Sequence, residues 1–206
     1  MYLNCHTYYS LRYGALSPAE LVAAAVGRGV DSLALTDINN TSCHIEFYKR
    51  CREAGIRPLL GVEFRHEGKL LYTGLARDAE GLGELNHLLA TAPLKRNPLP
   101  VVPPPMEHAH LIYLHPPQGP AQLGPNEWIG VRPEGVNQLF SSPFRQLSHK
   151  LVAFSPVTFL DGEGYGLHRL LRAIDGNTLL SKLKPEDLAK KTELFHPPAV
   201  LRRLYK

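Results

Sequence analysis

The sequence predicts an α/β barrel. Short apolar segments typical of strands alternate with segments whose apolar residues recur at helical spacing, and roughly six or seven strands are expected in this order. Neither a Gly-x-Gly-x-x-Gly nor a Walker pattern follows any of these strands. The alternation therefore favours a barrel over an open doubly wound sheet, and the missing glycine motifs argue against nucleotide binding.

The first element, residues 2–14, reads as a strand that runs into a polar turn. Side chains alternate between the two faces of a strand, so Asn4 and His6 share one face. The opposite face carries Leu3, Cys5 and Thr7. A polar pair at a spacing of two indicates a strand whose end approaches a site.

A helix is expected from Ser17-Pro18-Ala19-Glu20 to the glycines at 27 and 29, because a Ser cap, a Pro at the first position and a Glu three residues later coincide. Residues 32–37 form a short apolar run typical of a buried parallel strand. A second helix over 41–54 and a third strand over 58–64 complete a right-handed parallel unit.

Residues 66–69 predict a turn, and residues 70–76 a fourth strand that pairs with the third as a hairpin. Asp78 can cap a helix that carries Leu82, Leu85, Leu88 and Leu89. Proline-rich residues 93–105 predict an extended surface segment. Further strands are expected over 109–115, 128–132 and 151–159, with a loop at 116–125 and helical segments at 135–140, 167–174, 179–191 and 199–205.

Composition describes an ordinary globular protein. The chain has 206 residues, 44% hydrophobic and 20% charged, which suits one sizeable core, and it has no apolar run long enough to span a bilayer. Residues following Met1 predict a strand and not a signal peptide. Three cysteines, Cys5, Cys43 and Cys51, lie inside predicted elements, which indicates reduced thiols and a cytoplasmic location.

The net charge of +4 is concentrated near the end of the chain. Residues 182–206 hold seven Lys and Arg and three Asp and Glu. Such an excess can bind nucleic acid, with Lys190, Lys191, Arg202 and Arg203 as candidates. The simpler interpretation, which we favour, is the solvated surface of a helix that leads into more protein.

Three motifs occur in order: Asn4-Cys5-His6 with Ser10 and Gly14, then Ala34-Leu35-Thr36-Asp37, then Gly61-Val62-Glu63. Together they resemble the PHP (polymerase and histidinol phosphatase) domain, and most closely the PHP domain that opens bacterial DNA polymerase III alpha subunits. The likeness covers roughly the first 90 residues and resumes near residues 150–183. It implies a distorted seven-stranded (β/α)7 TIM-like barrel over 1–183, and a basic helical tail over 184–206 that leads toward a polymerase domain lacking from this chain.

In a barrel, site residues lie at the carboxyl ends of strands, where His6, Asp37 and Glu63 are expected. The resemblance assigns these three to a metal site, but Asn4 and Ile38 stand where PHP phosphoesterases have His. Leu71 or Tyr72 replaces a fourth-strand His, and Pro156 and Thr158 replace a late Asp-x-His. The remaining residues either hold one divalent ion weakly or form a hydrogen-bonded cluster in which His6 is neutral and paired to a carboxylate.

Other candidate groups are weaker. His108 and His110 form a second His-x-His, but they begin a strand and are expected at the wrong end of the barrel. Tyr8, Tyr9 and Tyr13 are expected to pack over the barrel mouth, with stacking on bases as the alternative.

Hydrolysis of a phosphate ester by bound metals needs clustered ions, and three protein ligands cannot hold two or three. We therefore expect lost phosphoesterase activity and no cofactor, or at most Zn, Mn or Mg at low occupancy. The resemblance implies a structural domain of a DNA-directed DNA polymerase, with the rest of the alpha subunit, a proofreading exonuclease and DNA as partners and no membrane. The alternatives are an active metal-dependent phosphoesterase or 3′-5′ exonuclease with a reduced site, and a nucleic-acid-binding module.

Overall fold

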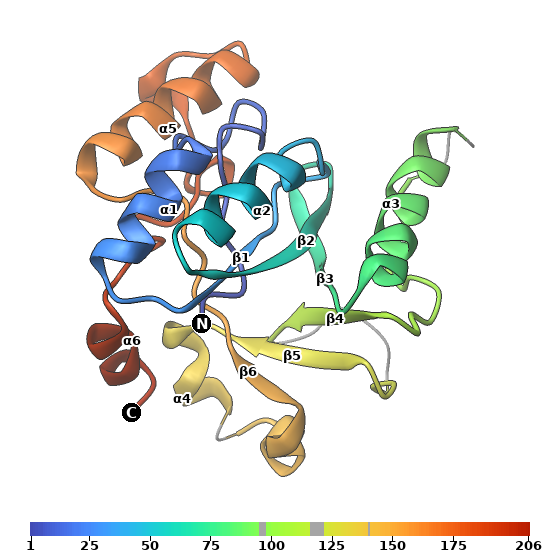
Figure 1. Cartoon of the computed structure of the whole chain (residues 1–206). Coiled ribbons are helices and arrows are strands. Elements are labelled where there is room, and N and C mark those ends of the chain that lie inside the picture. The colour runs from blue at the N-terminus through green and yellow to red at the C-terminus, as the bar shows by residue number, and fades with distance from the viewer. Residues whose placement is uncertain (95–97, 116–121, 140) are drawn as a thin grey trace.

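A mixed sheet of six strands curls through the centre of the protein (Figure 1). The computed structural model describes residues 1–94, 98–115, 122–139 and 141–206. Parts of the expected segments 93–105, 116–125 and 135–140 lie outside these ranges. The strands follow chain order: β1 (Ser32–Leu35), β2 (Arg57–His66), β3 (Lys69–Ala76), β4 (Ala109–Leu114), β5 (Glu127–Val131) and β6 (Leu151–Ala153).

The strand directions agree with the local sequence signals. The β1–β2, β4–β5 and β5–β6 pairs are parallel, and β3 is antiparallel to both β2 and β4. The predicted β2–β3 hairpin is confirmed, with positive φ at Glu67 and Gly68 in its turn. The α/β class is confirmed, and the barrel takes the form of a curled mixed half-barrel.

The N-terminal segment links the two edges of this sheet. It forms isolated parallel bridges from Tyr2 to Leu33 in β1 and from Cys5 to Val157, which follows β6. The expected regular first strand is therefore wrong. The hydroxyl of Thr36 accepts from the Cys5 N–H at 3.2 Å, while the Thr36 N–H donates to the Cys5 carbonyl at 2.9 Å, and this interrupts the ladder.

Helices lie against the sheet and beyond the ends of its strands (Figure 1). They are α1 (Pro18–Gly27), α2 (His44–Glu53), α3 (Ala79–Leu94), α4 (Val136–Leu139), α5 (Gly162–Asp175) and α6 (Pro198–Leu204). The predicted capping box of α1 is present, since Ser17 accepts from the Glu20 N–H and Glu20 accepts from the Ser17 N–H. Asp78 likewise caps α3 through the Gly81 N–H.

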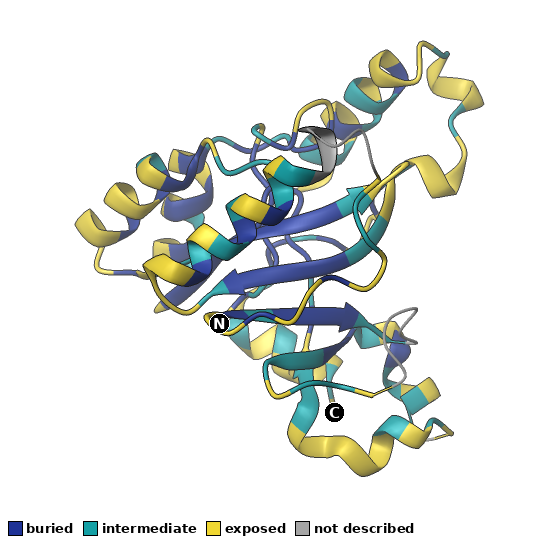
Figure 2. Cartoon of the chain, turned by 90° about the vertical axis from the view of Figure 1, so that its right-hand side faces the viewer, coloured by how far each residue is buried: buried dark blue, intermediate teal, exposed yellow. Residues whose placement is uncertain are grey.

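Three apolar clusters form the main core, and the sheet strands carry many of its buried residues (Figure 2). One cluster lies between the sheet and α1 and α2, and includes Phe47 and Phe195. A second lies beneath α3 and includes Phe64 and Leu85. A third, smaller cluster, with Ile112 and Phe154, fills part of the concave side. The three cysteines are buried and free.

The expected helix over 179–191 is wrong. This stretch contains two 3-10 turns, η3 (Leu180–Lys182) and η4 (Pro185–Asp187). Pro185 disfavours helical backbone at the preceding residue, and Lys184 is extended at φ −91°, ψ 157°. In the tail only the seven-residue α6 is α-helical among the described residues, and Phe195 anchors the segment in the core.

Candidate functional site

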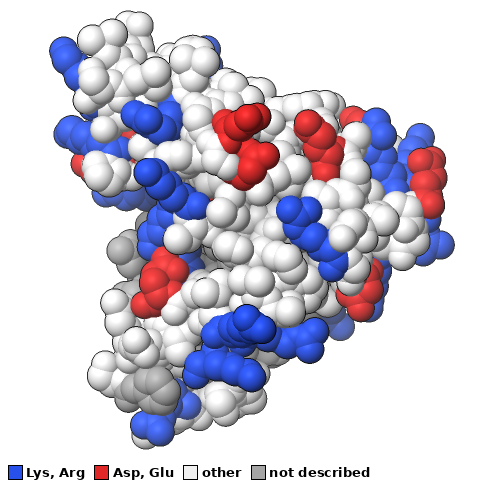
Figure 3. All heavy atoms as spheres, turned by 90° about the vertical axis from the view of Figure 1, so that its left-hand side faces the viewer, with Lys and Arg blue, Asp and Glu red and all other residues white. Residues whose placement is uncertain are grey.

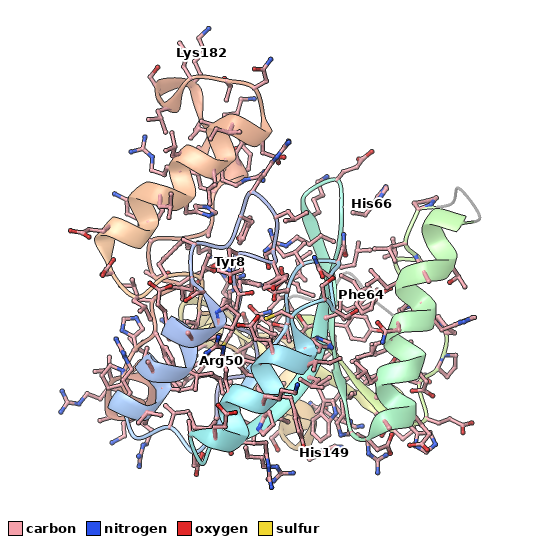
Figure 4. The ribbon with its side chains drawn as sticks, turned by 45° about the horizontal axis from the view of Figure 1, so that its top comes forward. Tyr8, Arg50, Phe64, His66, His149 and Lys182 are labelled. Atoms are coloured by element: carbon pink, nitrogen blue, oxygen red, sulfur yellow. The ribbon has the colours of Figure 1, made fainter. Side chains whose placement is uncertain are left out.

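Four buried polar side chains lie around the carboxyl end of β1. Asn4, His6, Asp37 and Glu63 are each 1% exposed or less. The N-terminal segment carries Asn4 and His6 on one face, as the alternation predicts, and Asp37 and Glu63 come from the end of β1 and from β2. In Figure 4 Phe64 points toward α3, so its neighbours in the strand, Glu63 and Arg65, face the opposite side.

Glu63 is the centre of the cluster. Its Oε2 accepts from Asn4 Nδ2 at 2.7 Å and lies 3.2 Å from His6 Nε2, while its Oε1 accepts from Arg65 Nε at 2.5 Å. Burial alone would raise the pKa of Glu63, but the Arg65 cation, followed by His6 and Asn4, holds it well below its usual range. Glu63 is therefore a carboxylate paired with an internal cation.

Arg65 was not predicted as a site residue. Its guanidinium lies 4.4 Å from the Tyr13 ring centroid, and Nη2 donates to the Tyr13 hydroxyl at 3.1 Å. The side chain is 14% exposed, and Glu63 outweighs the effect of burial to raise the Arg65 pKa. The sequence Glu63-Phe64-Arg65 could have predicted this pair, since residues two apart in a strand point the same way.

Asp37 holds the first loop rather than the Glu63 cluster. It accepts from the Thr7 N–H, the Thr7 hydroxyl and the Ser10 hydroxyl, each at 2.7 Å. Burial raises the Asp37 pKa against the lowering effect of these hydrogen bonds. The same loop needs Gly14, because a Cβ there would lie 1.8 Å from the Thr7 carbonyl oxygen. This loop places Tyr13 over His6, with ring centroids 5.6 Å apart.

A second chain of polar groups holds the other side of the His6 ring. Its Nδ1 lies 3.1 Å from the Thr158 hydroxyl, which donates to Glu193 at 2.7 Å. Because the hydroxyl gives its proton to Glu193, it accepts from His6 Nδ1–H. Glu193 also pairs with Arg132 at 3.4 Å. Thr158, from the segment that follows β6, and Glu193, from the tail, thus join the cluster.

Two buried atoms beside Glu63 have no hydrogen-bond partner among the described residues: Asn4 Oδ1 and His6 Nε2. The 3.2 Å contact of Nε2 with Glu63 is close but not oriented as a hydrogen bond. These two atoms are thus buried polar atoms of the cluster that no described residue satisfies.

A cleft of about 550 Å³ lies outside the cluster. Its lining includes Tyr13, Ile38, Asn39 and Arg65, but neither His6 nor Glu63. Tyr13 and Arg65 therefore separate the buried carboxylate from the cleft. In Figure 4 the loop of Tyr8 and the hairpin tip with His66 stand on either side of this region.

The other predicted histidine pair does not join this site. His108 Nδ1 lies 2.9 Å from Asp78, and His110 accepts from Trp128 Nε1 at 3.2 Å, both at the other end of the sheet. Over the described ranges, three potential ligand atoms lie within 4.8 Å of one another only in the exposed group Asp78, Glu80 and His108. His6, Asp37 and Glu63 do not form such a group.

The basic residues of the tail lie on separate elements. Lys190 pairs with Glu134, Lys191 Nζ lies 5.4 Å from the Tyr165 ring, and Arg202 and Arg203 lie in the last turn of α6. On the face shown in Figure 3, Lys and Arg form several groups with Asp and Glu between them. A helix long and apolar enough to cross a membrane is not found in the described part of the chain.

The fold and the cluster define an α/β protein with a polar site at the carboxyl ends of its strands. Residues 3–120 match the PHP domain family, and the chain belongs to that family. The resemblance noted in the motifs of the sequence is therefore confirmed, and the match runs about 30 residues beyond the first 90 that the motifs covered.

Curated relatives include bacterial polymerases. The chain is 38% identical over 98 residues to an error-prone DNA polymerase of Symbiobacterium thermophilum, covering 48% of this chain and 9% of that protein. It is 41% identical over 61 residues to the DNA polymerase III subunit alpha of Chlamydia trachomatis, covering 30% and 5%. The chain thus spans less than a tenth of the length of these two relatives.

Solved structures with similarity include a putative metal-dependent phosphoesterase from Bifidobacterium adolescentis, at 16% identity and a TM-score of 0.41, covering 95% of this chain and 58% of that one. An amidohydrolase from Chromobacterium violaceum, with bound sulfate and no metal, is 30% identical with a TM-score of 0.37, covering 46% and 34%.

Proposed function

We propose that this PHP domain has lost phosphoesterase activity and serves as a structural and interaction domain of a bacterial replicative DNA polymerase of the DNA polymerase III alpha type. The observation that carries the proposal is the buried pair of Glu63 and Arg65. An internal guanidinium occupies the side of the carboxylate that a metal ion would need.

The donor set also does not fit a metal cluster. Ile38 has no donor, Asn4 gives its amide N–H to Glu63, and the Asp37 oxygens accept from Thr7 and Ser10. Two-metal hydrolysis needs several carboxylates and imidazoles that are free to bind ions on both sides of the phosphate. The cluster offers one imidazole nitrogen and one amide oxygen beside a carboxylate that is already neutralised.

Relatives that are polymerases support the partners we propose. These are the remainder of an alpha subunit and a proofreading exonuclease, with DNA contacted through the parent polymerase. The basic residues Lys190, Lys191, Arg202 and Arg203 are proposed as a secondary DNA contact, which would weaken steeply with rising salt.

The first test measures metal content and turnover. The purified chain is incubated with Zn²⁺ or Mn²⁺, desalted and analysed by mass spectrometry, and assayed on p-nitrophenyl phosphate and on 3′-labelled single-stranded DNA. We expect less than about 0.1 equivalent of metal and no turnover. One or more equivalents together with metal-dependent turnover would overturn the lost activity.

The scaffold role needs a separate test. Binding of this chain to a DNA polymerase III alpha subunit from which the PHP domain has been deleted is measured by calorimetry. We expect a complex with micromolar or tighter affinity, roughly −8 kcal/mol. Absence of binding at about 10 μM protein, ten times the expected dissociation constant, would contradict the scaffold role. It would not affect the conclusion drawn from the metal and turnover measurements.

A phosphoesterase or 3′-5′ exonuclease with a reduced site is the second candidate. The unpartnered His6 Nε2 and Asn4 Oδ1 favour it, because both atoms belong to side chains that contact Glu63. In this alternative one divalent ion is held weakly and Arg65 moves away from Glu63. The variant Arg65→Met would then raise metal affinity and turnover together, whereas under our proposal turnover stays absent.

A further inference from the structure

An apolar pit opens at the end of the sheet opposite the Glu63 cluster. Its volume is about 390 Å³. The pit lies where β2, β4, β5 and β6 begin and β3 ends, on the concave side of the sheet. Its apolar wall includes Leu3, Leu59, Leu75, Ile112, Trp128 and Val152.

Barrel interiors are normally filled by layers of side chains. Here the filling is incomplete, because Leu3, Leu59, Trp128 and Val152 are only partly buried. Figure 2 shows intermediate burial in the same part of the sheet, and the first two residues of β5 and of β6 are of this kind. The pit is therefore an open part of the core.

Cations surround this pit. Arg57 and Arg77 belong to its lining, and Lys150 Nζ lies 5.1 Å from the Trp128 ring. The lining contains neither Asp nor Glu. Within the described ranges neither arginine forms an ion pair, although Arg77 Nη1 donates to the Glu107 carbonyl at 3.4 Å. Both guanidinium groups thus remain able to pair with an anion.

His110 adds no charge to the pit. Its Nδ1 accepts from the Trp128 indole N–H at 3.2 Å, which requires an unprotonated nitrogen. Burial lowers the His110 pKa, and Arg77 lowers it further. The cationic side chains at the pit are therefore those of arginine and lysine.

The geometry points to a binding site for a small amphiphilic carboxylate, whose aliphatic or aromatic body enters the pit and whose carboxylate pairs with Arg57 and Arg77. Pockets for small molecules start at about 300 Å³, have mostly apolar walls and use a few polar groups for orientation. Arginine suits this role because its fork of N–H donors matches a carboxylate. The site is separate from the Glu63 cluster and does not depend on the proposed function.

Trp128 is the only tryptophan in the chain and lies in the pit wall, so its fluorescence reports on binding. The probes are octanoate and 4-phenylbutyrate, with 1-octanol and octylamine as matched apolar bodies without the negative charge. We expect a saturable change in fluorescence, confirmed by calorimetry, with the carboxylates bound about tenfold more tightly than the alcohol.

Charge variants test the role of the arginines. Arg57→Gln combined with Arg77→Gln should reduce carboxylate affinity about tenfold and leave octanol affinity within about twofold. Both side chains are exposed, so the fold should be kept. Lys182→Gln is the matched control, since Lys182 lies at the far end of the molecule in Figure 4 and should have no effect.

Filling variants test the pit itself. Two variants, Val152→Phe and Leu59→Phe, each place a larger side chain in the pit. Each variant that keeps the wild-type melting curve should bind none of the probes. Absence of a saturable signal in the wild type, equal affinity for octanoate and octylamine, or no effect of the arginine variant would overturn the inference. Preference for an acidic leucine-containing peptide over octanoate would assign the pit to a protein partner and also overturn it.

Discussion

Asn39 holds the backbone of Arg65 with both atoms of its side-chain amide. Its Nδ2 donates to the Arg65 carbonyl at 2.9 Å, and its Oδ1 accepts from the Arg65 N–H at 2.9 Å. Asn39 has a φ of 47°, a conformation that Asn adopts more readily than most residues. The segment after β1 thereby positions the residue that neutralises Glu63, close to a shift of register in the β2–β3 pair between Phe64 and Arg65.

Two replacements of Asn39 separate the contribution of its side-chain hydrogen bonds from that of its positive φ. Asn39→Gly keeps the positive φ but loses both hydrogen bonds, at a cost of about 1–2 kcal/mol in the free energy of unfolding. Asn39→Ala also brings the strain of a left-handed backbone and should cost about 1 kcal/mol more. Urea denaturation of both variants measures the difference. Equal stability of the two would contradict the role of φ.

Arg65→Met should destabilise the protein by about 3–5 kcal/mol at pH 7, because it leaves Glu63 as a buried, unpaired carboxylate. Arg65→Met combined with Glu63→Gln removes both charges and should recover about half of that loss. The surface pair of Glu46 and Arg50 is the control, since both side chains are more than a third exposed. Arg50→Gln should cost about 0.5 kcal/mol or less. If Arg65→Met cost no more than this control, the internal pair would not be the basis of the site.

Stability should fall as the pH drops from 6.5 toward 4 because of His168. Its Nδ1 contacts the Tyr13 carbonyl at 2.7 Å and its Nε2 accepts from the Ala189 N–H at 2.9 Å, so the neutral ring satisfies both atoms. Burial lowers the His168 pKa to about 4. The unfolded chain therefore binds the proton first, and stability that is present above pH 6.5 decreases by about 3 kcal/mol on reaching pH 4.

Urea denaturation between pH 7.5 and 4.5 measures this slope. His168→Asn should be less stable throughout but should show a flatter dependence on pH. His66→Asn is the control, because His66 lies exposed at the hairpin tip and its replacement should leave the slope unchanged. If His168→Asn showed the wild-type dependence of stability on pH, His168 would not be the cause of that dependence.

Restoring imidazole ligands should not restore metal binding while Arg65 is present. Asn4→His with Ile38→His adds two donors at the positions where PHP phosphoesterases carry His, but Arg65 still neutralises Glu63. Adding Arg65→Met should strengthen Zn²⁺ binding at least about tenfold relative to the double variant. Competition with a chromophoric chelator measures both affinities. If the double variant already bound Zn²⁺ tightly, the loss of metal binding would be caused by the missing ligands and not by Arg65.

Local sequence signals predicted much of the fold. The capping box at Ser17 and Glu20, the cap at Asp78 and the hairpin around Gly68 were correct because each depends on residues close in sequence. Residues 179–191 failed because apolar spacing suggested a helix that Pro185 interrupts. The first strand failed because a hydroxyl distant in sequence, that of Thr36, takes the Cys5 N–H.

The sequence alone determined the family, the shared face of Asn4 and His6, and the positions of Asp37 after one strand and Glu63 in another, since strand alternation and short motifs are local properties. Only the tertiary structure decided what these side chains do. In the folded protein Asp37 accepts hydrogen bonds from the first loop and does not contact Glu63, whereas Glu63 pairs with Arg65. The tertiary structure also brought Glu193 to Thr158 from 35 residues away. The physical reason is that a buried charge must find its partner in three dimensions, and which partner is within reach depends on how the sheet curls.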